Sequence, residues 1–203
     1  MRIGIQFSEK RKKIMQCDFE IFTPAAEADF TALWQFNYRI FAAELKMRPE
    51  NQERFLVDKF HHKNIYRAAR RRQDGALIGM ISAHWQPPFS AEDHFGSAAV
   101  TPPAAGKLAE IRLFSVAPEY RKTAVTTSLG ISLLQELEKH QISEIVISGI
   151  SIQKKFYERL GFQVIGEPVP AGDTLLYPMR ISLAPFLEMC RKLNCYQLCS
   201  DNR

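Results

Sequence analysis

The segment from Leu108 to Ile150 constrains the fold more than any other part of the sequence. Residues 108–116 predict a β-strand, and residues 118–121, which begin with a proline, predict a turn. Residues 144–150 are rich in isoleucine and valine and predict a second strand. Between them, apolar residues recur at a spacing of four, which predicts a helix with one buried face: Val125, Leu129, Leu133 and Leu137.

The rest of the chain continues this mixture of strands and helices. Further strands are expected at 17–22, 64–72, 76–86, 162–165 and 175–183, and further helices at 25–45, 152–160 and 185–193. Asp74-Gly75 between two of these strands is a strong hairpin signal. From Pro87 to Gly106, proline and small polar residues predict a loop of about 20 residues. The pattern favours an α/β fold of the layered α+β kind over a pure βαβ repeat.

The 203 residues, of which 46% are hydrophobic and 24% charged, suit one globular domain. Lys10, Arg11, Lys12 and Lys13 form a basic cluster near the start. We therefore expect a basic N-terminal arm at residues 1–16 and a single domain at 17–203. The net charge of +5 favours phosphate-bearing or acidic partners in general.

Several classes of function are disfavoured by the sequence. No zinc-finger spacing or RNA-recognition signature is present, so we expect no nucleic-acid partner. No apolar run approaches the ~18 residues of a transmembrane helix, and the N-terminus is not that of a signal peptide. The four cysteines form no C-x-x-C pair, so we expect free thiols, no metal and a cytoplasmic protein.

Two segments in the second half match one known family. The first is Ala109-Glu110-Ile111 followed by residues 116–121, and the second is Phe-Tyr-Glu-Arg-Leu-Gly-Phe at 156–162. Their sequence and order resemble the GNAT superfamily of acyl-CoA N-acyltransferases. The resemblance implies a central mixed, mostly antiparallel sheet flanked by helices. It also implies transfer of an acyl group from acyl-CoA or acyl carrier protein to an amine acceptor.

In that family, a loop of the form Arg/Gln-x-x-Gly-x-Gly/Ala opens the main helix, and the pyrophosphate of coenzyme A binds at the helix N-terminus. The positions that the resemblance assigns to the cofactor are Val116, Arg121, Lys122, Ala124, Val125, Thr126 and Thr127. Ala124 and Thr126 stand at the two glycine positions. Threonine adds a branched Cβ where the phosphates pass, although its hydroxyl can donate to them. The alternative is therefore a non-catalytic GNAT-like binding or interaction module with a degenerate cofactor loop.

Glu110 is the predicted base, because a glutamate has this role at the matching position of histone-acetylating members. Period two would place Glu110, Arg112, Phe114 and Val116 on one face of their strand. An apolar cleft would raise the pKa of Glu110, and Arg112 would lower it. We assign Arg112 and Phe114 to the acceptor, since a guanidinium binds a carboxylate in a bidentate manner. The alternative is a structural pair between Glu110 and Arg112.

Tyr157 corresponds to the tyrosine that commonly protonates the departing thiolate in the family. A core aromatic with a hydrogen-bonded hydroxyl is the alternative at this position.

Residues 38–45 and 55–58 resemble the start of long-chain N-acyl amino acid synthases and acyl-homoserine-lactone synthases, so an amino acid is a candidate acceptor. Asn37 replaces an arginine of those enzymes, and His61 replaces a second acidic residue of the lactone synthases. These differences count against strict lactone synthesis. Four arginines form a cluster that is either a solvated strand end or a dock for a carrier protein: Arg67, Arg70, Arg71 and Arg72.

Overall fold

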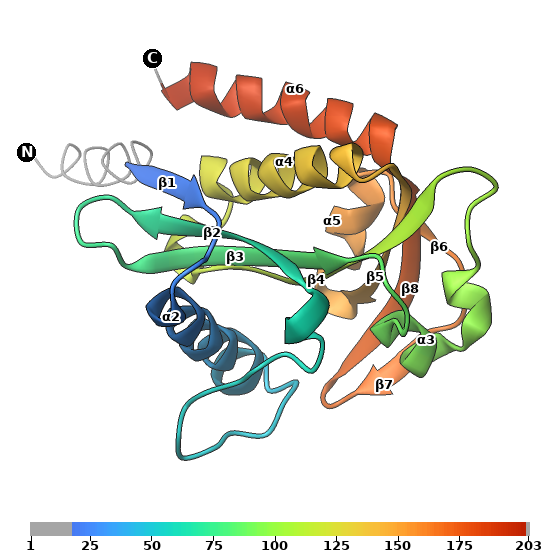
Figure 1. The fold of residues 1–203 in the computed structure, drawn as a ribbon, viewed down its shortest axis with the longest axis horizontal. Helices are drawn as coiled ribbons and strands as arrows, with labels where there is room; N and C mark the ends of the chain where they lie inside the picture. The colour runs from blue at the N-terminus through green and yellow to red at the C-terminus, as the bar shows by residue number, and fades with distance from the viewer. Residues whose placement is uncertain (1–17, 202–203) are drawn as a thin grey trace, which may run out of the picture.

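The computed structural model describes residues 18–201, with side chains as far as Lys192 (Figure 1). The predicted basic arm lies outside the described residues, so its separation from a single domain stays a prediction. No helix in the described part of the chain has the length and apolar character needed to cross a membrane.

One eight-stranded sheet organises the described chain, in the order β1-β2-β3-β4-β5-β8-β6, with β7 paired to β8. The strands are β1 Phe19–Phe22, β2 Ile65–Arg71, β3 Leu77–His84, β4 Lys107–Val116, β5 Ile142–Ile150, β6 Gln163–Val164, β7 Val169–Ala171 and β8 Thr174–Ser182. The pair β4–β5 is parallel, whereas the other described pairs are antiparallel. The predicted α/β fold with a mixed, mostly antiparallel sheet is confirmed.

Helices lie on both faces of the sheet (Figure 1). They are α2 Glu27–Tyr38, which continues as a π-helix η1 at Arg39–Glu44, α3 Ser90–Phe95, α4 Ala124–Lys139, α5 Lys154–Arg159 and α6 Leu183–Asp201. Helices α4 and α6 cover one face, and α2 and α3 lie on the other. The four apolar residues that predicted α4 are all fully buried in the main core, as the spacing of four requires.

The segment that we expected to be a loop, 87–106, contains the helix α3 and a short helical turn η3 at Ser97–Val100. That prediction is wrong. Ala91 of α3, with Phe95 and Val100 beside it, packs on Leu108 of β4 and Val146 of β5. Burial of this small apolar cluster stabilises a segment whose local sequence is rich in turn-forming residues.

Strand β4 contains a β-bulge that changes which side chains share a face. Arg112 lies opposite Ser82 of β3, but Ser115 lies opposite Met80, so β4 carries one extra residue in between. Leu113 in the bulge has a φ of 54°. Because residues opposite one another point to the same face, Ser115 follows Arg112 on its face and Val116 lies on the other.

The predicted single face containing Glu110, Arg112, Phe114 and Val116 is therefore wrong beyond Arg112. Side chains alternate between the two faces of a strand only where each residue is paired with one residue of the neighbouring strand. The bulge adds an unpaired residue and so interrupts this alternation. Phe114 lies within the bulged stretch of the register.

Strands β4 and β5 separate next to Glu110. Their parallel pairing runs from Lys107 to Glu110 on β4, where Glu110 lies opposite Val146. Within the described chain, no pairing of the two strands continues beyond that point, although β4 extends to Val116 and β5 to Ile150. The sheet thus opens between the end of β4 and the end of β5.

Candidate active site

Glu110 lies at the point where β4 and β5 separate, and its side chain is 1% exposed. Its Oε2 accepts a hydrogen bond of 2.8 Å from the backbone N–H of Ser90, and its Oε1 accepts one of 2.8 Å from that of Ala91. His84 Nε2 lies 3.2 Å from Oε2, and Arg112 Nη1 lies 3.5 Å from it. The carboxylate therefore ties the first turn of α3 to the sheet.

These partners decide the charge of Glu110. Burial alone would raise the pKa of Glu110, but the hydrogen bond from His84, the charge of Arg112 and the N–H of Ser90 together lower that pKa below its usual value. Glu110 is thus ionised at neutral pH, and its two carboxylate oxygens contact the N–H groups of α3 and the side chains of His84 and Arg112. Its predicted role as base stays a prediction.

Arg112 is held by a second buried carboxylate, which the sequence did not single out as a site residue. Asp58 Oδ2 accepts from Nε of Arg112 at 3.1 Å and from Nη2 at 2.8 Å. The side chains of Asp58 and Arg112 are 2% and 12% exposed. The guanidinium also lies 4.9 Å from the centre of the Phe60 ring. Asp58, Arg112 and Glu110 thus form one buried charge network.

The predicted cofactor loop leads from Val116 into the N-terminus of α4. Thr123 is the N-cap residue, and its hydroxyl accepts from the N–H of Val125 and donates to the carbonyl of Tyr120. The N–H of Thr126 donates to the carbonyl of Thr123. The predicted positions 121–127 therefore form one helix start, where the positive end of the helix dipole favours an anion.

Arg121 makes contacts within the protein at the start of this loop. Its Nε donates to the carbonyl of Val116 at 3.0 Å, and its Nη2 lies 2.6 Å from Oε1 of Glu44 at the end of η1. Arg121 thus fixes the end of β4 against the N-terminal helical segment. Lys122 is exposed and has a φ of 65°, so its charge is the more accessible one at the helix start.

Tyr157 lies beside the separated part of β5. A Cβ atom built on Gly149 would lie 3.2 Å from Cδ2 of Tyr157, so the ring covers the backbone of Gly149. Phe162 contacts the ring edge-on, with the ring centres 5.9 Å apart. Burial raises the pKa of Tyr157 to about 12, which keeps its hydroxyl protonated at neutral pH.

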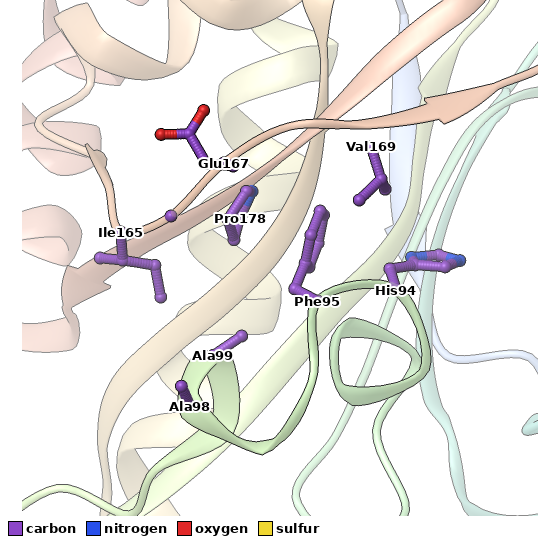
Figure 2. A pocket seen from close by; sticks show the side chains of 9 residues that line it. His94, Phe95, Ala98, Ala99, Ile165, Glu167, Val169 and Pro178 are labelled. Carbon is purple, nitrogen blue, oxygen red and sulfur yellow. The ribbon is translucent and has the colours of Figure 1, made fainter.

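A cavity of about 280 Å³ lies on the face of β5 that is opposite to Tyr157 (Figure 2). Its walls are mostly apolar and come from α3–η3 and from the β6–β8 edge: Phe95, Ala98, Ala99, Ile165, Val169 and Pro178. His94 of α3 lies at one end, and its Nδ1 is 3.2 Å from Oγ of Ser148 on β5. His94 and Ser148 were not predicted from the sequence, because they are far apart in the chain and meet only because α3 forms.

The profile of the acetyltransferase (GNAT) domain matches residues 52–183, which is more than half of the chain. The chain belongs to the GNAT family. The matched range contains the opening between β4 and β5, the start of α4 and the α5 segment of this GNAT protein. The predicted class, a GNAT-type acyltransferase, is confirmed at the level of the family.

Solved structures similar to this GNAT protein include enzymes of two related kinds. The CoA-dependent acyl-homoserine lactone synthase BjaI, solved with MTA, has a TM-score of 0.70 at 14% identity, over 87% of this chain and 89% of that one. The AHL synthase LasI has a TM-score of 0.68 at 14% identity, over 85% and 92%. FeeM, an N-acyl amino acid synthase from uncultured soil microbes, has a TM-score of 0.64 at 16% identity, over 83% and 92%.

At these identities the likeness shows the fold alone, and it agrees with the branch of the GNAT superfamily that residues 38–45 and 55–58 suggested. Comparison with curated protein sequences gives no match.

The arginine cluster on β2 and the turn that follows it is engaged in ion pairs. Arg67 pairs with Glu136 of α4, Arg70 with Glu20 of β1, and Arg71 with Asp74. Arg72 pairs with both Asp18 and Glu20. The exposed pairs of Arg70, Arg71 and Arg72 agree with the interpretation as a solvated strand end, whereas Arg67 is 14% exposed and packs against α4.

Proposed function

We propose that this GNAT protein transfers an acyl group from an acyl-thioester, either acyl-CoA or acyl carrier protein, to a small-molecule amine, with an amino acid among the candidates. The observation that carries the proposal is the opening between β4 and β5, flanked by the start of α4 and Tyr157 on one side and by the Glu110–Arg112 network on the other. Both predicted catalytic residues, Glu110 and Tyr157, are next to this opening.

The donor is proposed to bind at the start of α4. Its phosphates would meet the helix N-terminus and Lys122, and its thioester would enter the opening beside Val116 and Tyr157. Tyr157 then protonates the leaving thiolate, a role supported by the position of its ring over Gly149 beside the opening. Because acyl-CoA and acyl carrier protein are intracellular donors, a cytoplasmic location is part of the proposal.

The alternative, a non-catalytic binding module, is supported by Ala124 and Thr126 at the two glycine positions and by the use of the Val125 N–H in the N-cap. The two functions differ in their need for a donor. Calorimetric titration with octanoyl-CoA, and separately with octanoyl carrier protein, should give micromolar binding of at least one donor if the protein is an acyltransferase. Absence of binding to both would favour the module.

A further inference from the structure

Two consecutive residues in the separated part of β5 contact different side chains, one on each face of the strand. Ser148 contacts Nδ1 of His94, whereas Gly149 lies under the ring of Tyr157. Successive residues of a strand point to opposite faces. His94 and Tyr157 therefore flank the same stretch of β5, one from the α3 side and the other from the side of α4 and α5.

We propose that His94 is the base that takes the proton of the acceptor amine, and that the cavity beside it holds a compact apolar substituent of that amine. This inference rests on the proposed acyl transfer and assigns its proton acceptor. Glu110 then acts as a positioning residue, because its carboxylate holds the N–H groups of Ser90 and Ala91 at the start of the helix that carries His94 one turn later.

The hydrogen bonding of His94 leaves one ring nitrogen for the reaction. In the tautomer that donates from Nδ1 to Ser148 Oγ, Nε2 carries a lone pair. Among the described residues no group bonds to Nε2. Glu110 has no such unbonded atom, since both of its carboxylate oxygens already accept hydrogen bonds from α3.

The surroundings of His94 keep the imidazole neutral at pH 7. Burial is the largest influence and lowers the pKa of His94 below its usual value. Glu110 opposes this shift, whereas the positive charges of Arg48, Lys59 and Arg112 add to it. Asp93, the neighbouring residue on α3, is paired with Lys59. A neutral imidazole is the form that can accept a proton.

The cavity defines the chemical class of the acceptor. Its volume of about 280 Å³ lies just below the range of about 300–1,000 Å³ that is typical of small-molecule sites. Its walls are apolar except for His94 and Glu167, and they favour a primary amine with a compact apolar substituent over a polyamine or a peptide. An ammonium group at the edge of such a cavity loses its proton more easily than in water, because low polarity disfavours the charged form.

The proposed reaction balances without any further reactant. His94 Nε2 takes one proton from the bound ammonium, and the neutral nitrogen attacks the thioester carbonyl carbon, forming the C–N bond. The C–S bond then breaks with its electron pair on sulfur, which takes the proton of the Tyr157 hydroxyl. Tyr157 regains a proton from the acylated nitrogen, and His94 releases its proton to water, so that amide, thiol and one proton are the products.

The pH dependence of kcat/KM tests this assignment. The full-length protein is assayed with octanoyl-CoA, and separately octanoyl carrier protein, against leucine, valine and phenylalanine as probes. We expect His94→Gln to lower kcat/KM by about 100-fold or more and to abolish the loss of activity on the acid side. Glu110→Gln should lower kcat/KM but keep that acid limb. His62→Gln, on an exposed histidine of the short helical turn η2 at His61–Lys63, is the matched control.

A second variant tests the cavity. Ala98→Leu, at an exposed position of its lining, should raise KM for leucine and leave KM for the donor unchanged. If the wild type transfers the acyl group and His94→Gln keeps its rate and acid limb, the role of His94 is rejected while the proposed function stands. If Glu110→Gln alone removes the acid limb, Glu110 is the base. If the wild type transfers nothing from either donor, the proposed function and the role of His94 fall together.

Discussion

Gly149 on β5 lies directly beneath the ring of Tyr157. A Cβ atom at Gly149 would be 3.2 Å from Cδ2 of the ring and 2.8 Å from Sδ of Met179. Both distances are shorter than ordinary contacts between carbon or sulfur atoms. The absence of a side chain at Gly149 therefore sets the position of the proposed acid beside the opening in the sheet.

Substitution of Gly149 by alanine should displace Tyr157 and Met179. We expect Gly149→Ala to lower the free energy of unfolding by about 1–3 kcal/mol, as overpacked core sites do, and to reduce kcat more than the donor KM. Gly130→Ala is the matched control, because no atom lies within 4 Å of its added Cβ on α4 and alanine favours a helix. Urea denaturation and steady-state kinetics measure both effects, and equal behaviour of the two variants would contradict this role of Gly149.

Removal of one partner from the buried ion pair of Asp58 and Arg112 should destabilise the protein strongly. Arg112→Gln leaves the Asp58 carboxylate buried without its partner, so we expect a loss of about 3–5 kcal/mol in unfolding free energy. The double variant Asp58→Asn/Arg112→Gln should recover part of that loss, since position 58 then carries no buried charge, while Glu110 keeps its bonds to Ser90, Ala91 and His84. A double-mutant cycle by urea denaturation gives the coupling energy. Additive losses would show that the two side chains act independently.

Glu110 should make the free energy of unfolding decrease as the pH falls into the acid range. Its pKa in the folded protein is below the unfolded value, so its contribution is complete above the unfolded pKa of about 4.3 and is lost as the pH falls through the folded pKa. We therefore expect the urea midpoint of the wild type to fall more steeply between pH 5 and pH 3 than that of Glu110→Gln. Parallel curves for the two proteins would contradict the lowered pKa.

Thr126 should weaken donor binding by its branched side chain. We expect Thr126→Gly to tighten octanoyl-CoA binding by up to about tenfold, which corresponds to ~1.4 kcal/mol, because glycine allows closer approach of the phosphates. The same change should cost about 1 kcal/mol of stability, as glycine does within a helix. Calorimetry measures the affinity. Weaker binding in the variant would indicate that the Thr126 hydroxyl is itself a ligand.

Helix α4 could be predicted from the sequence because its signal is local. Four apolar residues at a spacing of four all lie on the face that packs on the sheet and on α6, so the pattern and the packing agree. The Asp74-Gly75 hairpin is equally local, with Gly75 at a φ of 70°. These features need no knowledge of the rest of the fold.

Helix α3 and the bulge in β4 could not be predicted for the opposite reason. The N-terminus of α3 is capped by Glu110, about twenty residues later in the chain, so its stability depends on the folded sheet. The bulge shifts the register by one residue, and no residue type near Leu113 signals it. His94 and Ser148 come together only after α3 has packed on the sheet, and for this reason the sequence pointed to Glu110 alone as the base.

Formation of an amide is the decisive evidence for acyl transfer by this GNAT protein. The full-length protein is incubated with octanoyl-CoA or octanoyl carrier protein and a panel of apolar amino acids, and mass spectrometry follows the N-octanoyl product while a thiol reagent follows the released thiol. We predict equal amounts of amide and thiol, at a rate strongly reduced in Tyr157→Phe. Absence of amide with both donors, under conditions where the protein is folded, would contradict the assignment as an N-acyltransferase.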